Sequence, residues 1–334
     1  MTILRPATDA DAAGFIALIG AAWGEYPNLV LDVDKEVPEL RALATYFAGS
    51  GGMLWTAERD GAVVGMVGTR PLGSDQAWEI CRMYVAKSER DSGLAHRLLD
   101  MAEAHARAAG AHRMVLWTDT RFDAAHHFYE KRSYVRQGAI RILDDLSKSL
   151  EFRYAKPARG LVVEALDAAA AGSAERRLSE ILIACVAAGA SVSFLPPLAP
   201  SVARDFWRKV AADAAAGRKL LLGAWRDGVL VGTAQLILDM PQNQPHRADV
   251  AKVLVDPAAR RAGIGRALMQ RVEQAAQRMG RRLLVLDTLA GDAGEQLYRS
   301  MGWQEAGTIP GFALDEHGAE HATIFFWKRL PTPG

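Results

Sequence analysis

The chain has 334 residues, half of them apolar and 24% charged, which is enough for about two ordinary globular domains of roughly 150 residues each. A formal net charge of +1 excludes a general basic field for nucleic acid or an anionic membrane. The two cysteines, Cys81 and Cys185, are far apart in sequence and have no metal-type spacing, so neither a disulfide framework nor a zinc site is indicated. No apolar run reaches the roughly 20 residues of a membrane span, and residues 1–15 do not resemble a signal peptide, so a cytoplasmic protein without a nucleic-acid or membrane partner is expected.

The first half starts with a strand and one or two helices, followed by a predicted hairpin over residues 52–71. Its turn lies in ERDGAVVG, residues 58–65, where Asp-Gly between alternating apolar runs favours a tight turn. A long strand is expected over residues 76–86 and a helix after the RDSGLA stretch that starts at Arg90. Another strand, a helix and closing strands complete a mixed α/β or α+β pattern.

The second half repeats these landmarks in the same order. WRDGVLVG, residues 225–232, matches the hairpin turn, and RRAGIG from Arg260 matches RDSGLA. An acid lies 14 residues before each motif glycine, each half has an apolar run that ends in Asp-Thr, and a tyrosine follows. Five landmarks at an offset of 167 to 170 residues predict two copies of one domain. AKPARG, residues 155–160, has the Pro and Gly of a connector between them.

The glycine motif predicts an anion site. Arg260–Arg266 follows an apolar strand and opens an amphipathic helix, so unpaired amides and the helix dipole would attract a pyrophosphate. Glycine permits close approach of a phosphate, and arginine adds complementary charge. The motif is neither a dinucleotide fingerprint nor a P-loop. A glycine-rich turn that merely starts a surface helix is the alternative.

Both motifs resemble the acyl-CoA signature R-x-x-G-x-G/A of the GNAT superfamily of N-acetyltransferases, so the resemblance covers nearly the whole chain. The second half also resembles the tabtoxin resistance acetyltransferase group in LLVLDTLAGDAGEQLYRSMGW, residues 283–303, and GTIPGFAL, residues 307–314. The resemblance implies two tandem domains, residues 1–157 and 160–330. Each would have a mixed, mostly antiparallel central sheet flanked by helices, with two strands splayed around the pantetheine of acetyl-CoA.

The resemblance also implies which residues contact acetyl-CoA as the co-substrate. In the second half these are Val253, Leu254, Val255, Arg260, Arg261, Ala262, Gly263, Ile264, Gly265 and Arg266. In the first half they are Met83, Tyr84, Val85, Arg90, Ser92, Gly93, Leu94, Ala95 and His96. The strand residues would bind the pantetheine and the loop residues the pyrophosphate. No metal is expected.

Acetyl transfer to an amine needs a proton acceptor for the ammonium and a proton donor for the departing thiolate. The family resemblance assigns the donor role to Tyr298, and to Tyr129 in the first half. Asp249 and its counterpart Glu79 could take the amine proton or bind a cationic acceptor, and Asp287 could help with either task. Nothing in the sequence indicates a covalent acyl-enzyme, which favours direct attack in a ternary complex.

Each candidate also has a purely structural interpretation. The tyrosines could be core residues with hydroxyls at the edge, Asp249 and Glu79 could lie on a solvated strand face, and Asp287 could be a turn or cap residue. Cys81 is interpreted as a small buried residue rather than a nucleophile. His126 and His127 are interpreted as a pair on a helix surface.

The two halves differ at the anion loop. The second loop carries Arg260, Arg261 and Arg266, whereas Glu89 and Asp91 flank Arg90 in the first and would oppose a pyrophosphate. The second half is therefore predicted to be the catalytic domain, and the first to bind CoA weakly or to be structural. The predicted function is acetylation of a small, amino-acid-like, antibiotic or toxin amine. The alternatives are a CoA-binding sensor or scaffold that has lost catalysis, and a protein N-acetyltransferase.

Overall fold

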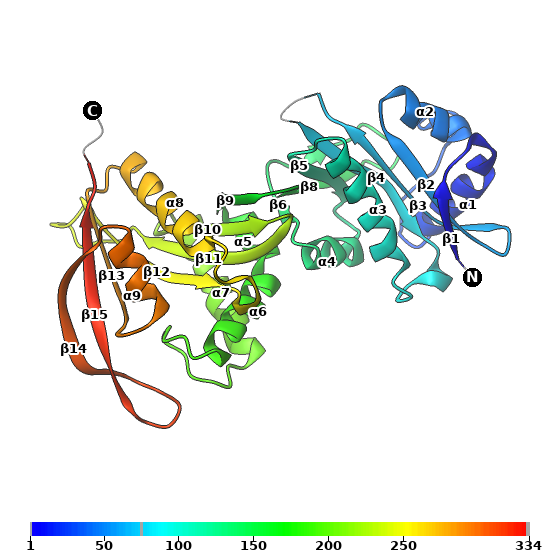
Figure 1. Cartoon of the computed structure of the whole chain (residues 1–334). Coiled ribbons are helices and arrows are strands. Elements are labelled where there is room, and N and C mark those ends of the chain that lie inside the picture. Colours follow the sequence, from blue (N-terminus) through cyan, green and yellow to red (C-terminus); the bar gives the residue numbers. More distant parts are fainter. Residues whose placement is uncertain (1, 74–75, 332–334) are drawn as a thin grey trace. The chain divides into compact units, whose positions relative to one another are not determined.

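The computed structural model describes residues 2–73 and 76–331, which divide into two compact units (Figure 1). Unit 1 comprises Met1–Tyr129 and Arg136–Arg159, and unit 2 comprises Glu130–Val135 and Gly160–Gly334. Each contains one mixed sheet with helices on its faces, which confirms the predicted fold class.

Unit 1 is built around the strand order β1-β2-β3-β4-β5-β8-β6, with β7 also paired to β8. Only β4 and β5 run parallel among the neighbouring strands whose register is known. Its strands are β1 (Ile3–Pro6), β2 (Met53–Arg59), β3 (Ala62–Pro71), β4 (Ala77–Val85), β5 (Arg113–Asp119), β6 (Val135–Arg136), β7 (Arg141–Ile142) and β8 (Leu150–Pro157). Its helices are α1 (Ala12–Trp23), α2 (Leu43–Gly49), α3 (Leu94–Ala108) and α4 (Asp123–Lys131), with short 3-10 turns η1 (Asp9–Asp11), η2 (Pro38–Ala42) and η3 (Lys87–Glu89).

Unit 2 has the strand order β14-β15-β13-β12-β11-β10-β9, in which only β12 and β13 are parallel. Its strands are β9 (Leu161–Leu166), β10 (Lys219–Arg226), β11 (Val229–Ile237), β12 (Arg247–Val255), β13 (Leu283–Leu289), β14 (Gln304–Leu314) and β15 (Glu320–Arg329). Its helices are α5 (Ala168–Ser173), α6 (Glu175–Ala187), α7 (Pro200–Ala215), α8 (Ile264–Arg278) and α9 (Ala293–Ser300), with the 3-10 turn η4 (Pro257–Ala259). One core lies between the sheet and α8, and another between the sheet and helices α5 to α7.

The repeated hairpin has one geometry in both units. Asp60 and Gly61 have φ of 51° and 80°, and Asp227 and Gly228 have 49° and 81°, as the Asp-Gly turn predicts. The glycine four residues beyond each turn glycine lies under the following helix. A Cβ added to Gly232 would come within 3.2 Å of Leu268, so the lack of a side chain lets α8 lie close to the sheet.

The parallel strands separate after three paired residues. Arg247–Asp249 of β12 pairs with Leu283–Val285 of β13, and beyond these residues the two strands are no longer paired. Unit 1 repeats this arrangement, with Glu79 opposite Val115 at the last paired position of β4 and β5. The splay implied by the resemblance is therefore present in both sheets, and each opens at an acidic residue.

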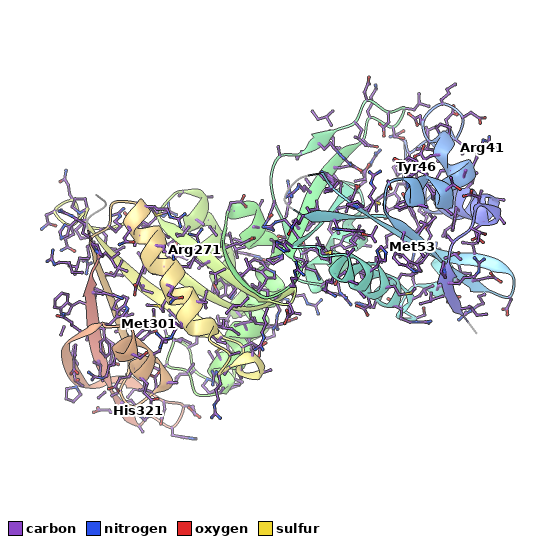
Figure 2. All side chains as sticks on the ribbon, turned by 45° about the horizontal axis from the view of Figure 1, so that its top comes forward. Arg41, Tyr46, Met53, Arg271, Met301 and His321 are labelled. Carbon is purple, nitrogen blue, oxygen red and sulfur yellow. The ribbon has the colours of Figure 1, made fainter. Side chains whose placement is uncertain are left out.

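An ion pair joins the long helix to the last strand in each unit, and the pair of unit 1 is buried. Lys156 Nζ lies 2.8 Å from Glu103 in unit 1, and both side chains are almost fully buried. In unit 2, Lys328 Nζ lies 2.8 Å from Glu273 and also donates to the carbonyl of Met301, which is labelled in Figure 2. Within residues 2–73 and 76–331, no helix is long and apolar enough to cross a membrane.

Candidate active site

The anion loop of unit 2 begins where β12 ends. Arg261 and Gly263 have φ of 62° and 77°, and Gly263 is the N-cap of α8. This left-handed conformation turns the chain sharply into the helix and leaves the first helical amides without intrahelical partners. A Cβ on Gly263 would meet nothing within 4 Å, so backbone conformation rather than crowding requires glycine there. The loop thus has the backbone geometry of an anion site.

Three arginines surround this loop on its solvent side. Arg260, Arg261 and Arg266 are all exposed. Arg266 donates to the hydroxyl of Ser300 over 2.8 Å, and none of the three forms an ion pair within the described part of unit 2. Their positive charge is therefore available to a phosphate.

The loop of unit 1 has the same backbone but its polar groups are already engaged. Asp91 and Gly93 have φ of 61° and 81°. Arg90 forms a two-pronged ion pair with Glu25, over 2.5 and 2.8 Å, and the Ser92 hydroxyl accepts the amide of Leu94 over 3.3 Å. The Glu25 carboxylate thus occupies the guanidinium of Arg90, the group that would bind a pyrophosphate.

Glu89 does not act as the sequence suggested. It is buried and pairs with Arg59 over 2.6 Å, so its charge is compensated at the end of the hairpin. The acid that opposes anion binding is Glu25, which sequence reasoning missed because it follows α1, 65 residues before Arg90.

The acids of unit 2 lie on one face of the sheet. Ala248 and Val250 face α8, so Asp249 points to the opposite face, toward α6 and α7. Leu284 and Leu286 also face α8, which places Asp287 on the same face as Asp249. The two acids interact, because burial and then the charge of Asp287 raise the pKa of Asp249, against the opposing effect of Arg247.

Asp249 has no strong partner. Arg247 Nη1 lies 3.3 Å from Oδ1, yet this oxygen is buried without a hydrogen bond from any described residue. Its cross-strand neighbour is Ile237, which offers no charge. A raised pKa and an unsatisfied oxygen at the point where the strands separate are features of a proton acceptor. Asp287 is exposed in the middle of β13, and Asp292, not Asp287, caps α9.

The corresponding acids of unit 1 are neutralised. Glu79 is buried and pairs with its cross-strand neighbour Arg70 over 2.7 Å. Asp119 accepts two hydrogen bonds from the guanidinium of Arg121, at 2.8 and 2.6 Å.

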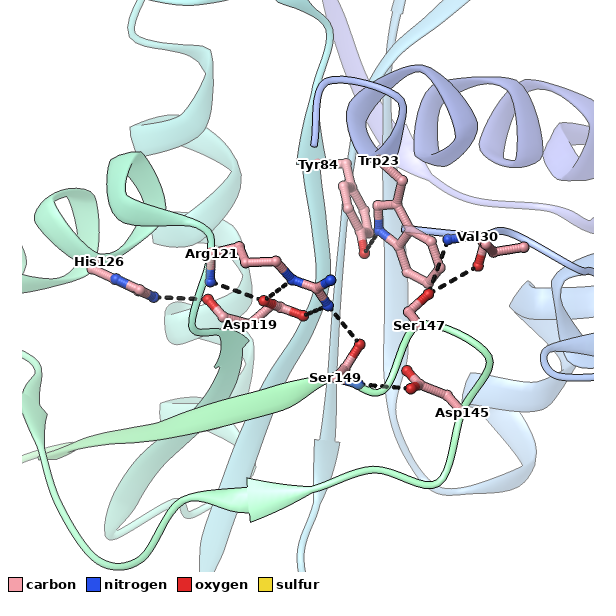
Figure 3. A network of polar contacts seen from close by, with 9 residues as sticks. All are labelled: Trp23, Val30, Tyr84, Asp119, Arg121, His126, Asp145, Ser147 and Ser149. Atoms are coloured by element: carbon pink, nitrogen blue, oxygen red, sulfur yellow. Dashed lines mark hydrogen bonds and ion pairs between the residues drawn. The ribbon is translucent and has the colours of Figure 1, made fainter. Parts of the chain in front are cut away.

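Arg121 also donates to Ser149, at the end of a loop that closes on the segment after α1 through a bond from the Val30 amide to Ser147 (Figure 3). Neither acid of unit 1 is left free to accept a proton.

The two tyrosines share a position but not their contacts. Tyr298 of α9 is 7% exposed and packs beside Trp303 and Phe326, and the described residues offer its hydroxyl no hydrogen bond. Tyr129 of α4 donates to the sulfur of Met83 over 3.6 Å. Burial raises the pKa of both phenols, so each stays protonated at neutral pH and can act only as a donor.

The strand residues expected to contact the pantetheine follow the opening of each splay. Val253, Leu254 and Val255 end β12, and Met83, Tyr84 and Val85 end β4. In unit 1 this edge is partly covered, because Met83 accepts the Tyr129 hydroxyl and Tyr84 accepts the indole N–H of Trp23 over 3.0 Å.

Of three further residues, His126 was misjudged, Cys81 agrees with its interpretation as a structural residue, and Lys252 was missed. His126 is buried, with Nε2 2.9 Å from the Asp119 carbonyl, so it does not belong to a helix-surface pair. Burial raises the pKa of Cys81 to about 12, which makes the thiolate of a nucleophile unfavourable. Lys252 lies on the acid-bearing face of β12 and was not considered. Its signal was a lysine inside an apolar strand, 170 residues after Arg82 in the matching strand.

Comparison with known proteins identifies the relatives of this chain. The profile described as "Acetyltransferase (GNAT) family" matches residues 17–134 and 191–303. An N-acetyltransferase in the hisH-hisA intergenic region of Azospirillum brasilense is 33% identical over 104 residues, or 30% of this chain and 60% of that protein.

Two solved structures are also similar. Salmonella typhimurium yncA with its cofactor acetyl-CoA has 18% identity and a TM-score of 0.45, over 53% of this chain and 97% of its own. The ribosomal-protein-alanine N-acetyltransferase of Brucella melitensis has 22% identity and a TM-score of 0.43, over 51% and 99%.

Proposed function

The chain belongs to the acetyltransferase (GNAT) family, and we propose that unit 2 transfers an acetyl group from acetyl-CoA to the primary amine of a small molecule. The observation that carries the proposal is the contrast between the units. Among the described residues of unit 2, the loop arginines form no ion pair, Asp249 has only long contacts with Arg247, and the Tyr298 hydroxyl has no hydrogen bond. In unit 1 the corresponding arginine, acid and tyrosine each have a close partner.

The chain fits acetyl-CoA through backbone and charge. The amides at the start of α8 and the guanidinium groups of Arg260, Arg261 and Arg266 would hold the pyrophosphate. The unpaired edge of β12 from Val253 to Val255 would offer backbone hydrogen bonds to the pantetheine amides. When bound, acetyl-CoA supplies an activated acetyl group as a thioester.

Side chains of unit 2 would then move the protons. Asp249 accepts a proton from the acceptor's ammonium group, directly or through water, and Asp287 adds negative charge that attracts this cation. The freed amine attacks the acetyl carbon, an amide C–N bond forms and the C–S bond breaks. The Tyr298 hydroxyl would donate its proton to the sulfur, so that CoA leaves as a thiol. The second proton, which the nitrogen loses as the amide forms, would pass to Tyr298, directly or through water, and restore its hydroxyl. No side chain needs to become acetylated.

Unit 1 is proposed to be structural, or to bind CoA weakly. Its fold and loop conformation match those of unit 2, and its Glu103–Lys156 ion pair corresponds to Glu273–Lys328. Its candidate site residues, however, already form ion pairs within the unit. The more specific resemblance of the second half to the tabtoxin resistance group stays a prediction, as does a cytoplasmic location.

The direct test measures binding and turnover together. Calorimetry on the full chain should show saturable binding of acetyl-CoA, and a panel of primary amines should give acceptor-dependent release of free CoA. Binding without release by any amine would favour the sensor or scaffold alternative. Release with a protein N-terminus but no small amine would favour the protein N-acetyltransferase alternative.

A further inference from the structure

Lys252 lies on the proposed acceptor face of unit 2. It has φ of 51° and lies where β12 bulges opposite Ala234, immediately after the splay opens. The bulge directs its side chain to the face toward α6 and α7, where its ammonium group reaches Ser193. Asp249 and Asp287 are on this same face.

The ammonium group of Lys252 has few partners. Nζ donates to the Ser193 hydroxyl over 3.1 Å and lies 5.9 and 6.0 Å from the ring centres of Phe194 and Phe206. No carboxylate of residues 2–73 or 76–331 lies within ion-pair distance. Burial lowers the pKa of Lys252, while the more distant Asp287 opposes this effect. An anion that binds beside Lys252 would supply the opposite charge that this ammonium group lacks.

The position equivalent to Lys252 in unit 1 carries a cation that has a carboxylate partner. Arg82, 170 residues earlier, has the same φ of 51° in the same bulge of β4. Its guanidinium pairs with Glu39 of η2 over 2.7 Å. The fold therefore places a cation at the bulge in both units, but among the described residues only those of unit 1 supply a carboxylate that neutralises it.

We infer that Lys252 binds a carboxylate of the acceptor, so the acceptor is an amino acid or a close derivative that carries both a primary amine and a carboxylate. The inference rests on the proposed function of unit 2. Asp249 and Asp287 would attract the ammonium end and Lys252 the carboxylate end, so both signs are matched. An amine without an anionic group would bring a second cation beside Lys252 and leave its charge unpaired.

The test uses matched pairs of acceptors with the full chain. The probes are the L-amino acids and the straight-chain amino acids from glycine to 6-aminohexanoate, each compared with its carboxamide. Wild type should acetylate a carboxylate member at least tenfold better than its carboxamide. Lys252→Met should lower kcat/KM for the carboxylate member roughly ten- to hundredfold, in line with the loss of one charged hydrogen bond, and change the carboxamide rate little.

Three controls accompany this comparison. Lys209→Met removes an exposed lysine of α7 and should leave the preference unchanged. Lys252→Arg retains the charge and should keep the preference, and calorimetry with acetyl-CoA should show an intact site in every variant.

Equal rates for carboxylate and carboxamide, or a Lys252→Met variant that retains the preference, would overturn the inference and leave the proposed function standing. If no acceptor causes release of CoA, the proposed function is wrong. Calorimetric binding of the same carboxylate and carboxamide pairs then decides the inference. Binding of carboxylate members that is lost in Lys252→Met supports it. Equal or absent binding overturns it.

Discussion

A phenol hydroxyl can protonate a leaving thiolate only if it is protonated and free of another acceptor. Tyr298 meets both conditions, whereas Tyr129 is already bonded to Met83. Tyr298→Phe is expected to lower kcat by roughly a hundredfold while acetyl-CoA binding persists, since only a hydroxyl is removed. Tyr129→Phe should leave turnover of the same amine largely intact. Steady-state rates at saturating acetyl-CoA decide between them, and the reverse ranking would move the active site to unit 1.

Asp249 links activity to stability. Its pKa is raised in the folded protein, chiefly by burial, so the fold binds this proton more tightly than the unfolded chain does. This contribution to stability is present at pH values below the pKa of the unfolded chain and is lost as the pH rises through the raised pKa. Asp249→Asn should therefore melt no lower than wild type at pH 7, while kcat/KM falls at least about tenfold.

The matched control for Asp249 is Glu79→Gln in unit 1. That change breaks the pair with Arg70, so melting should occur at a lower temperature while turnover stays near wild type. Thermal melts at several pH values and kinetic assays check both variants. A clear loss of melting temperature in Asp249→Asn at pH 7 would contradict the assignment of Asp249 as a weakly paired acid.

The sequence could place most candidate site residues on their strands, loops and helices, but it could not predict which side chains pair with them. Asp249 and Glu79 occupy equivalent positions, and the sequence around each shows only an acidic residue in an apolar strand. They differ because Arg70 lies across from one and Ile237 across from the other, and that contact depends on strand register. The role of Glu25 could not be predicted either, because its partner Arg90 is 65 residues away in the sequence. Sequence spacing locates a side chain on an element, but its partners come from tertiary contacts.

At the scale of single elements, the loop between β12 and α8 depends on a left-handed glycine. Gly263→Ala should destabilise this conformation by about 1 kcal/mol, because a Cβ disfavours positive φ even in open space. A loop that relaxes to avoid this cost must be strained again on binding. The dissociation constant for acetyl-CoA should therefore rise by up to roughly fivefold. Calorimetry measures it directly.

Gly93→Ala is the matched control for the loop. Gly93 has φ of 81° and equally open surroundings, so the local cost is the same. Because unit 1 is not proposed to carry catalysis, turnover should be unchanged. Equal losses of activity in both variants would show that both loops serve the reaction.

The elements themselves were predicted closely. The hairpin expected over residues 52–71 is β2 and β3, and the strand expected over 76–86 is β4. Alternating apolar residues and an Asp-Gly turn are local signals, so they predict strands and a hairpin without knowledge of tertiary contacts. The bulges at Arg82 and Lys252 were not predicted, because an extra strand residue leaves no mark in a short alternating pattern.

For the whole molecule, the contrast between the units predicts the number of ligands bound. Wild type should bind one acetyl-CoA tightly per chain, since Arg90 of unit 1 is already paired with Glu25. Glu25→Gln removes that internal anion and should reveal or strengthen a second, weaker site. Calorimetric stoichiometry tests this, with Glu36→Gln as a control on the same segment. Two equally tight sites in wild type would contradict the proposed division between the units.

The splayed strands have a consequence for how the empty protein behaves in solution. Where β12 and β13 stop pairing, the facing edges carry amide hydrogens with no acceptor across the gap, so deuterium from the solvent should replace these hydrogens quickly. A guest that hydrogen-bonds along this gap would slow the replacement. The same holds for β4 and β5, and peptides from the two strand pairs differ in mass. Isotope uptake can therefore report occupancy of each splay separately in the intact chain, without any chemical reaction taking place.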